Sequence, residues 1–134
     1  MNFNEIQVGQ RASVTKTITE ADVILFAGVS LDVNPAHMNE SYAETTFFKK
    51  RIAHGMLSAG LISAVLGTKL PGEGTVYLSQ ELNFTAPVYF GDTITAAAEV
   101  EQLIPEKKRI ILNTVCTNQD GKEVIHGKAT VSHK

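Results

Sequence analysis

The chain has almost nothing with which to cross-link itself, because its 134 residues include one cysteine, Cys116. A single thiol excludes a disulfide within the chain and fits a reducing compartment, so we expect the protein in the cytoplasm. The segment 110–116 is rich in apolar and β-branched residues and is typical of a strand. We therefore expect Cys116 to be a buried, unreactive thiol rather than a nucleophile.

Concentrated positive charge is missing as well. The 12 Lys and Arg residues are balanced by 14 Asp and Glu residues, which gives a net charge of -2. Phosphate backbones attract strong positive fields, so this balance excludes nucleic acid as a general partner. The basic runs 49–51 and 107–109 are typical of exposed loops or strand ends, and the first is also compatible with a phosphate-bearing ligand.

No apolar run is long enough for a membrane. The most apolar stretch, 56–66, has about half the length that a bilayer requires. Residues 1–5 lack the basic and apolar parts of a secretory signal, so we expect no membrane partner. With 43% hydrophobic and 19% charged residues, the chain is typical of a globular protein, and we expect one domain, residues 1–134.

The first half of the chain predicts one strand and several helices. Residues 11–18 are rich in β-branched side chains and predict a strand. Thr19, with an acid three residues later, is typical of a helix cap, and the helix should end near Gly28. A second short helix is expected over 40–46. Residues 55–67 are apolar on nearly every side, which predicts a buried helix.

The second half changes to a period of two. Alternating apolar and polar residues predict strands within 76–84, 93–103, 109–117 and 123–132, and a hairpin turn at 118–121 joins the last two. Together with the first strand, they predict an antiparallel sheet curled around the buried helix. A sheet this small cannot cover that helix alone, so we expect two copies to pair their edges as a homodimer.

The stretch 32–37, Asp-Val-Asn-Pro-Ala-His, places an acid and a base on either side of a proline. Pro35 fixes its own φ and drives Asn34 towards an extended conformation, so helical spacing does not apply here. A compact bend can direct Asp32 and His37 into one pocket, where a carboxylate and an imidazole around one water can move protons. The alternative is structural, with Asp32 in an Asx turn or cap and His37 as a loop histidine.

The stretch 53–56, Ala-His-Gly-Met, meets the start of the buried helix. The N–H groups of a helix N-terminus are free, and Gly55 lets a ligand oxygen come close because it has no Cβ. Such a donor can stabilise the oxyanion that forms from a thioester carbonyl. The alternative is that Gly55 only permits tight packing and that His54 only caps the loop. Ser63, two turns further on, either bonds to its own helix or orients Asp32.

Other chemical motifs are absent. The histidines at 37, 54, 126 and 133 show no spacing typical of metal ligands, so we expect no metal site. The sequence contains no phosphate-binding loop, no dinucleotide-binding fingerprint and no nucleophile elbow.

The motifs 32–37 and 51–57 (Arg-Ile-Ala-His-Gly-Met-Leu) together resemble the MaoC-like family, specifically the R-specific enoyl-CoA hydratases. The resemblance extends from Ile6 to Val131. It implies a hot dog fold, in which an antiparallel β-sheet wraps around a long central α-helix, and assembly as a dimer.

The resemblance also implies the reaction. Asp32 and His37 would activate one water, which adds reversibly to a trans-2-enoyl-CoA and gives the (R)-3-hydroxyacyl-CoA. The resemblance does not define the acyl chain length, and our own hypothesis is a short- to medium-chain substrate. Gly55 would donate its N–H to the thioester oxygen. No cofactor is expected, because coenzyme A arrives as part of the substrate.

Further residues have supporting roles in this interpretation. Ser63 matches the serine that steadies the catalytic acid, and Asn34 supports the same loop. His54 and Met56 are expected to contact the substrate.

Two other functions remain open. An acyl-CoA thioesterase of the same fold would also need a carboxylate, a water and an oxyanion donor. A non-catalytic acyl-CoA-binding or scaffold dimer would bind the ligand and turn over nothing.

Overall fold

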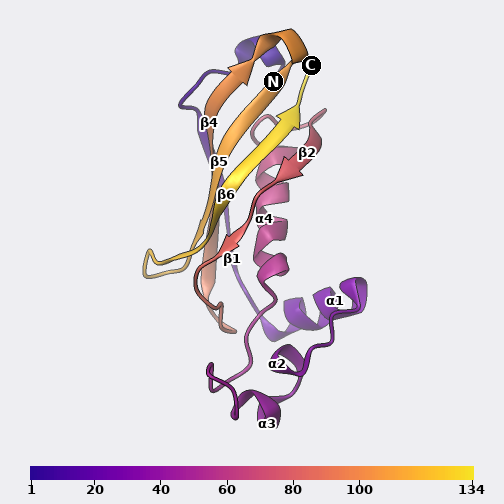
Figure 1. Cartoon of the computed structure of the whole chain (residues 1–134), viewed down its shortest axis with the longest axis vertical. Helices are drawn as coiled ribbons and strands as arrows, with labels where there is room; N and C mark the ends of the chain where they lie inside the picture. Colours follow the sequence, from indigo (N-terminus) through magenta and orange to yellow (C-terminus); the bar gives the residue numbers. More distant parts are fainter.

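The computed structural model describes all 134 residues, in which one antiparallel sheet carries a long helix along its face (Figure 1). Three short helices, α1 to α3, lie beyond one end of the sheet, near the start of the long helix α4. The elements in chain order are η1 (Phe3–Glu5), β1 (Arg11–Thr17), α1 (Glu20–Ser30), α2 (Pro35–Met38), α3 (Glu40–Ala43), α4 (Gly55–Thr68), β2 (Val76–Gln80), β3 (Asn83–Phe84), β4 (Thr93–Ile104), η2 (Pro105–Lys107), β5 (Arg109–Thr117) and β6 (Glu123–Ser132).

The sheet has the strand order β1-β4-β5-β6-β2, and the short β3 also pairs with β6. All of these pairs are antiparallel. The last three long strands follow one another as hairpins, and β1 joins β4 with Val14 opposite Ala96. The single early strand and the hairpin order of the last three strands are therefore confirmed, whereas β2, the first of the four late strands, pairs with β6 and not with its successor β4.

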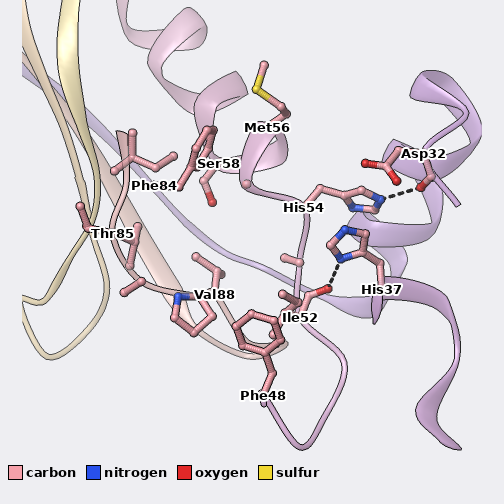
Figure 2. Close-up of a pocket in the computed structure, with 16 residues that line it drawn as sticks. Asp32, His37, Phe48, Ile52, His54, Met56, Ser58, Phe84, Thr85 and Val88 are labelled. Carbon is pink, nitrogen blue, oxygen red and sulfur yellow. Dashed lines mark hydrogen bonds between the residues drawn. The ribbon is translucent and has the colours of Figure 1, made fainter. Parts of the chain in front are cut away.

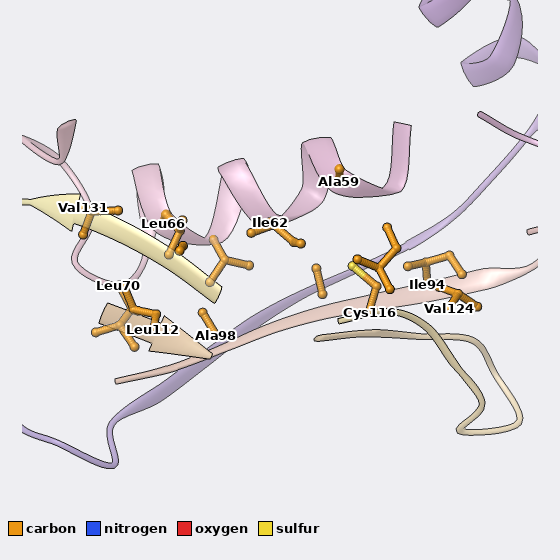
Figure 3. Packing of buried hydrophobic residues seen from close by; sticks show 14 of the residues in the cluster. Ala59, Ile62, Leu66, Leu70, Ile94, Ala98, Leu112, Cys116, Val124 and Val131 are labelled. Carbon is orange, nitrogen blue, oxygen red and sulfur yellow. The ribbon is translucent and has the colours of Figure 1, made fainter. Parts of the chain in front are cut away.

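Helix α4 lies against the sheet with one face only. Ile62 and Leu66 point towards the strands and belong to a core of 22 buried residues (Figure 3). On the other face, Met56 is 53% exposed, and Gly60 and Ser63 are exposed too. The expectation that this helix is buried on every side is wrong for a single chain, because one sheet can cover only one side of a helix.

The expected strand over 76–84 is interrupted, and β2 ends before β3 begins. Between them, the backbone of Glu81 crosses directly over Gly127 of β6, and the Glu81 N–H donates to the Lys128 carbonyl at 2.8 Å. A Cβ at Gly127 would lie 1.8 Å from the Glu81 carbonyl oxygen. Only glycine allows this close crossing, which breaks the alternation that the sequence suggested.

The helix expected over 40–46 is shorter than predicted and ends at Ala43. The hydroxyls of Thr45 and Thr46 donate to the carbonyls of Tyr42 and Ala43, at 2.6 and 2.7 Å. These side chains satisfy carbonyls that a further helical turn would otherwise bond.

Helix α1 begins as the sequence predicts. The Thr19 hydroxyl accepts a bond from the Asp22 N–H, and the Asp22 carboxylate accepts one from the Thr19 N–H at 2.9 Å. The helix runs to Ser30 rather than ending near Gly28, and Leu31 then takes the left-handed conformation with φ 66°. This reversal at Leu31 turns the chain sharply before the predicted site begins.

The arrangement is the hot dog fold that the resemblance implies, with the sheet packed along the long helix. Cys116 is buried as expected, and burial raises the pKa of its thiol to about 12. None of the helices combines the length and the apolar character needed to cross a bilayer.

Replacing Asp22 with Asn should lower the free energy of unfolding by about 1 kcal/mol near neutral pH, because the change weakens the cap of α1. The Thr19 N–H lowers the pKa of Asp22 below its ordinary value of 3.8. The stabilisation by the ionised carboxylate is therefore present above that ordinary value and is lost as the pH falls through the lower pKa of the folded state. Urea unfolding at neutral pH and near pH 3 measures this, and the two proteins should differ less in acid.

The matched control is Asp120→Asn, an exposed change in the 118–121 turn. It should alter the free energy of unfolding little at either pH. An Asp22→Asn variant as stable as the wild type at neutral pH would contradict the role of this cap.

Candidate active site

A cavity of about 520 Å³ opens where the α1–α3 region meets the start of α4 (Figure 2). Five of the predicted site residues line it: Asp32, His37, His54, Gly55 and Met56. In Figure 2, the acid and the two histidines lie on one side, near α1 and α2, and an apolar wall lies opposite. That wall includes Phe48, Phe84, Pro87, Val88, Val124 and Ile125. The cavity therefore has a polar end beside a surface suited to a hydrocarbon chain.

Asp32 lies in the turn between α1 and α2. The Asn34 N–H donates to its Oδ1 at 3.2 Å, so the Asx turn considered for Asp32 is present. No protein group bonds to the other carboxylate oxygen, Oδ2, which is free to bind a ligand. The structural and the chemical interpretations of Asp32 are therefore compatible.

Helix α2 directs His37. Asn34 caps this helix by accepting a bond from the Ala36 N–H at 2.9 Å, and Pro35 occupies its first turn. The proline thus begins a short helix instead of forming the simple bend that the sequence suggested. His37 Nδ1 donates to the Ile52 carbonyl at 2.8 Å, since a carbonyl can only accept. In the neutral ring the lone pair is then on Nε2, which can take a proton.

The backbone of His37 is held by the segment that precedes α4. The Ile52 N–H donates to the Ala36 carbonyl at 3.2 Å, and Arg51 Nε donates to the His37 carbonyl at 2.8 Å. The Arg51 guanidinium also pairs with Glu20 of α1. The imidazole is therefore fixed at its ring and at its backbone.

The acid and the base lie close together. Asp32, His37 and His54 each present one nitrogen or oxygen atom, and these three atoms lie within 4.8 Å of one another. Two groups that hydrogen-bond the same water lie about 4.5 Å apart. Asp32 and His37 are thus spaced to hold one water between them.

Gly55 is the first residue of α4, and its N–H has no acceptor within the protein. It lines the cavity beside the polar end. A Cβ at this position would lie 2.6 Å from two atoms of the Phe84 ring. The glycine permits close packing against Phe84, and its unpaired N–H lies at the cavity, so the two interpretations of Gly55 are compatible.

His54 and Ser58 carry the two buried side-chain atoms without a hydrogen-bond partner, Nδ1 and Oγ respectively. Both residues line the cavity. His54 occupies the N-cap position of α4, but its side chain makes no capping bond to that helix. Its Nε2 instead donates to the Asp32 carbonyl at 2.8 Å, as the dashed line in Figure 2 shows.

Ser63 is not brought to this cavity. It lies on the exposed face of α4, in a second hollow that it shares with Met56, Gly60 and Tyr77. The expected bond from Ser63 to Asp32 is absent within one chain, because α4 carries residue 63 two turns away from its N-terminus. Met56 borders both hollows.

Asp32, His37 and His54 are also placed so that they can supply ligands to a metal ion. The spacing argument missed this group, because the fold brings His54 to the separate stretch 32–37 that carries Asp32 and His37. His37 Nδ1 and His54 Nε2 donate to carbonyls, so only the other ring nitrogens would be available to a metal. The expectations of no metal and no cofactor remain predictions.

Most of the 16 lining residues were missed from the sequence, and three of them show why. Ser58 is one helical turn from His54, and that spacing was the available signal for a shared face. Phe84 resembled one more apolar strand residue, yet it is 52% exposed and borders the cavity. Nothing in the sequence pattern distinguishes Phe48, which lines the cavity, from Phe47, which is exposed.

Comparison with known proteins gives the family. Residues 2–123 match the family model described as MaoC like domain. An (R)-specific enoyl-CoA hydratase from Rhodospirillum rubrum is 61% identical over 129 residues, which cover 96% of this chain and 89% of the relative. A 3-hydroxybutyryl-CoA dehydratase from Methylorubrum extorquens is 48% identical, with 96% and 82% covered.

Among solved structures, the unliganded R-hydratase PhaJ1 from Pseudomonas aeruginosa matches with a TM-score of 0.93 and 49% identity. The match covers 98% of this chain and 84% of that one. The chain belongs to the MaoC-like family, as its two motifs indicated.

Replacing Gly55 with Ala should lower the free energy of unfolding by about 1–3 kcal/mol, because the added methyl group overpacks against Phe84. On the same helix, nothing lies within 4 Å of a Cβ at Gly67. Gly67→Ala should therefore be neutral or stabilise by up to about 1 kcal/mol through helix propensity. Denaturant unfolding measures both changes.

The double variant Gly55→Ala/Phe84→Ala should lose less stability than the sum of the two single variants. Equal effects of the two glycine substitutions would show that the Phe84 ring does not press on this position.

Proposed function

We propose that the protein catalyses the R-specific addition of water to trans-2-enoyl-CoA thioesters, and the reverse dehydration. The observation that carries this proposal is the pairing of Asp32 and His37 across the space of one water, in a cavity that the free N–H of Gly55 also faces. The names and the similarity of the two relatives support the substrate class and the stereochemistry.

In the proposed reaction, the acid and base pair takes one proton from the bound water, and the water oxygen forms a bond to Cβ of the enoyl group. The electrons of the double bond move towards the thioester carbonyl, where the Gly55 N–H stabilises the developing oxyanion. A proton is then delivered from the pair to Cα, which completes the hydroxyacyl product. No redox step occurs, so the proposal includes no cofactor other than the coenzyme A of the substrate.

The apolar wall sets the acyl class in this proposal. Phe84 lies beside Gly55, and Val124 and Ile125 are further apolar residues of this wall. A cavity of about 520 Å³ suits a short or medium acyl chain. A cytoplasmic location, where coenzyme A thioesters and a reduced Cys116 are both expected, is part of the same proposal.

Asp32→Asn and His37→Gln should each lower the hydration rate of crotonyl-CoA by about 100- to 10,000-fold while the protein stays folded. Each change keeps a similar shape and removes the group that moves a proton. The assay follows the loss of the enoyl absorbance with the thioester intact, and chiral analysis of the product should give the R alcohol.

The matched control is His126→Gln, a histidine on β6 outside the cavity, which should leave the rate unchanged. Release of free thiol by the wild type would identify a thioesterase instead. Tight binding of crotonyl-CoA with no turnover would identify a binding protein.

We also propose that two copies pair as a homodimer. The exposed face of α4 and both edges of the sheet are left uncovered in one chain. The hollow beside Gly60 is bordered by apolar residues from α4 and β2, which is the type of surface that a partner covers. If Ser63 does steady the catalytic acid, it must reach Asp32 of the other copy, because it lies away from Asp32 of its own.

Gly60→Leu tests this arrangement. Nothing lies within 4 Å of a Cβ at Gly60, so the larger side chain has room within one chain but would block a partner. The variant should remain folded by circular dichroism and should sediment as a monomer at concentrations where the wild type sediments as a dimer.

Ala21→Leu, at an exposed position outside the hollow, serves as the control and should leave the dimer intact. A monomeric wild type, or a dimeric Gly60→Leu variant, would rule out this face as the interface.

A further inference from the structure

His54 is a buried titratable group with no chemical part in the proposed reaction. Its side chain is 2% exposed, although it borders the cavity and immediately precedes Gly55. An imidazole in such a place needs hydrogen-bond partners, since burial of an unpaired polar group is unfavourable. The partner that it has is the backbone of Asp32.

The bond to Asp32 fixes the tautomer of His54. The carbonyl of Asp32 can only accept, so the hydrogen is on His54 Nε2, which lies 2.8 Å from the carbonyl oxygen. In the neutral ring, Nδ1 then has the lone pair, and it has no partner in the protein. His54 therefore binds the chain at Asp32 without occupying the Asp32 carboxylate.

The ring of His54 also fixes its neighbours by packing. It lies 3.9 Å from the His37 ring, centroid to centroid, with 32° between the two planes. On α1, the ring of Phe26 lies 4.8 Å away at 51°. One imidazole thus contacts the acid's backbone, the base's ring and the helix that precedes both, as Figure 2 shows for the first two.

We propose that His54 is a positioning residue that sets the separation of Asp32 and His37 and relates both to the N-terminus of α4. This inference rests on the proposed function for its kinetic test. His54 acts through a hydrogen bond and a ring contact, and it exchanges no proton with the substrate.

Two variants separate the two contacts. His54→Gln keeps an N–H donor for the Asp32 carbonyl and loses the ring, whereas His54→Phe keeps a ring between Phe26 and His37 and loses the donor. Each should lower kcat for crotonyl-CoA by about 10- to 100-fold and change KM by less than about threefold, because a small misplacement of reacting groups slows the chemical step. His126→Gln and His126→Phe, outside the cavity, are the matched controls and should leave both constants unchanged.

A double-variant cycle separates positioning from general destabilisation. If the His54 ring acts through its contact with His37, then His54→Gln, which removes that ring, should slow the His37→Gln enzyme by no more than about twofold. A further loss of 10-fold or more in the His37→Gln background would overturn the proposal, as would an unchanged kcat in both single variants.

Nuclear magnetic resonance of the imidazole nitrogens supplies a readout that does not depend on activity. In the wild type, His54 should show the Nε2–H tautomer and His37 the Nδ1–H tautomer. In His54→Gln, which removes the ring that packs on His37, the His37 signals should broaden or indicate a mixture of tautomers. His54 protonated at Nδ1 in the neutral protein would overturn the inference, whereas a wild type with these tautomers and no hydratase activity would overturn the proposed function alone.

Discussion

The site depends on the pairing of two short backbone segments, 36–37 and 51–53. The Ile52 N–H bonds to the Ala36 carbonyl, and the Ile52 carbonyl accepts from the His37 ring. The next residue, Ala53, donates to the Val88 carbonyl at 2.8 Å, which ties this pairing to the segment leading into β4. Together with the bonds from Arg51 and His54, these bonds hold the helices beyond the sheet against the start of α4.

Helix α4 has two functions in the same molecule. Its inner face, with Ile62 and Leu66, fixes the helix on the sheet, and its first residue then presents a free N–H at a defined place in the cavity. The close contact between Gly55 and Phe84 shows how tightly this end is packed. A rigid helix end of this kind can stabilise a developing charge with little rearrangement.

Much of the fold and of the reacting pair could be predicted, because the information is local. The alternation over 93–103 and the motif 32–37 can each be recognised within a few residues. The structure confirms the strand over the first and places Asp32 and His37 of the second at one cavity. The bond from His54 to Asp32 spans 22 positions and follows no periodicity. The exposed face of α4 was not predicted for a related reason. The apolar composition of the helix indicates burial, but it does not say whether the same chain covers every face.

Main-chain oxygens at positions 32, 37 and 52 hold the two imidazoles and the neighbouring arginine. Because every amino acid has a carbonyl, substitution at Ile52 leaves this scaffold in place. The stretch between the two pinned segments, 39–50, takes no part in these three bonds, and it delivers Phe48 to the apolar wall. A change at Phe48 would therefore alter the lining of the cavity while the bonds that hold the two imidazoles remain.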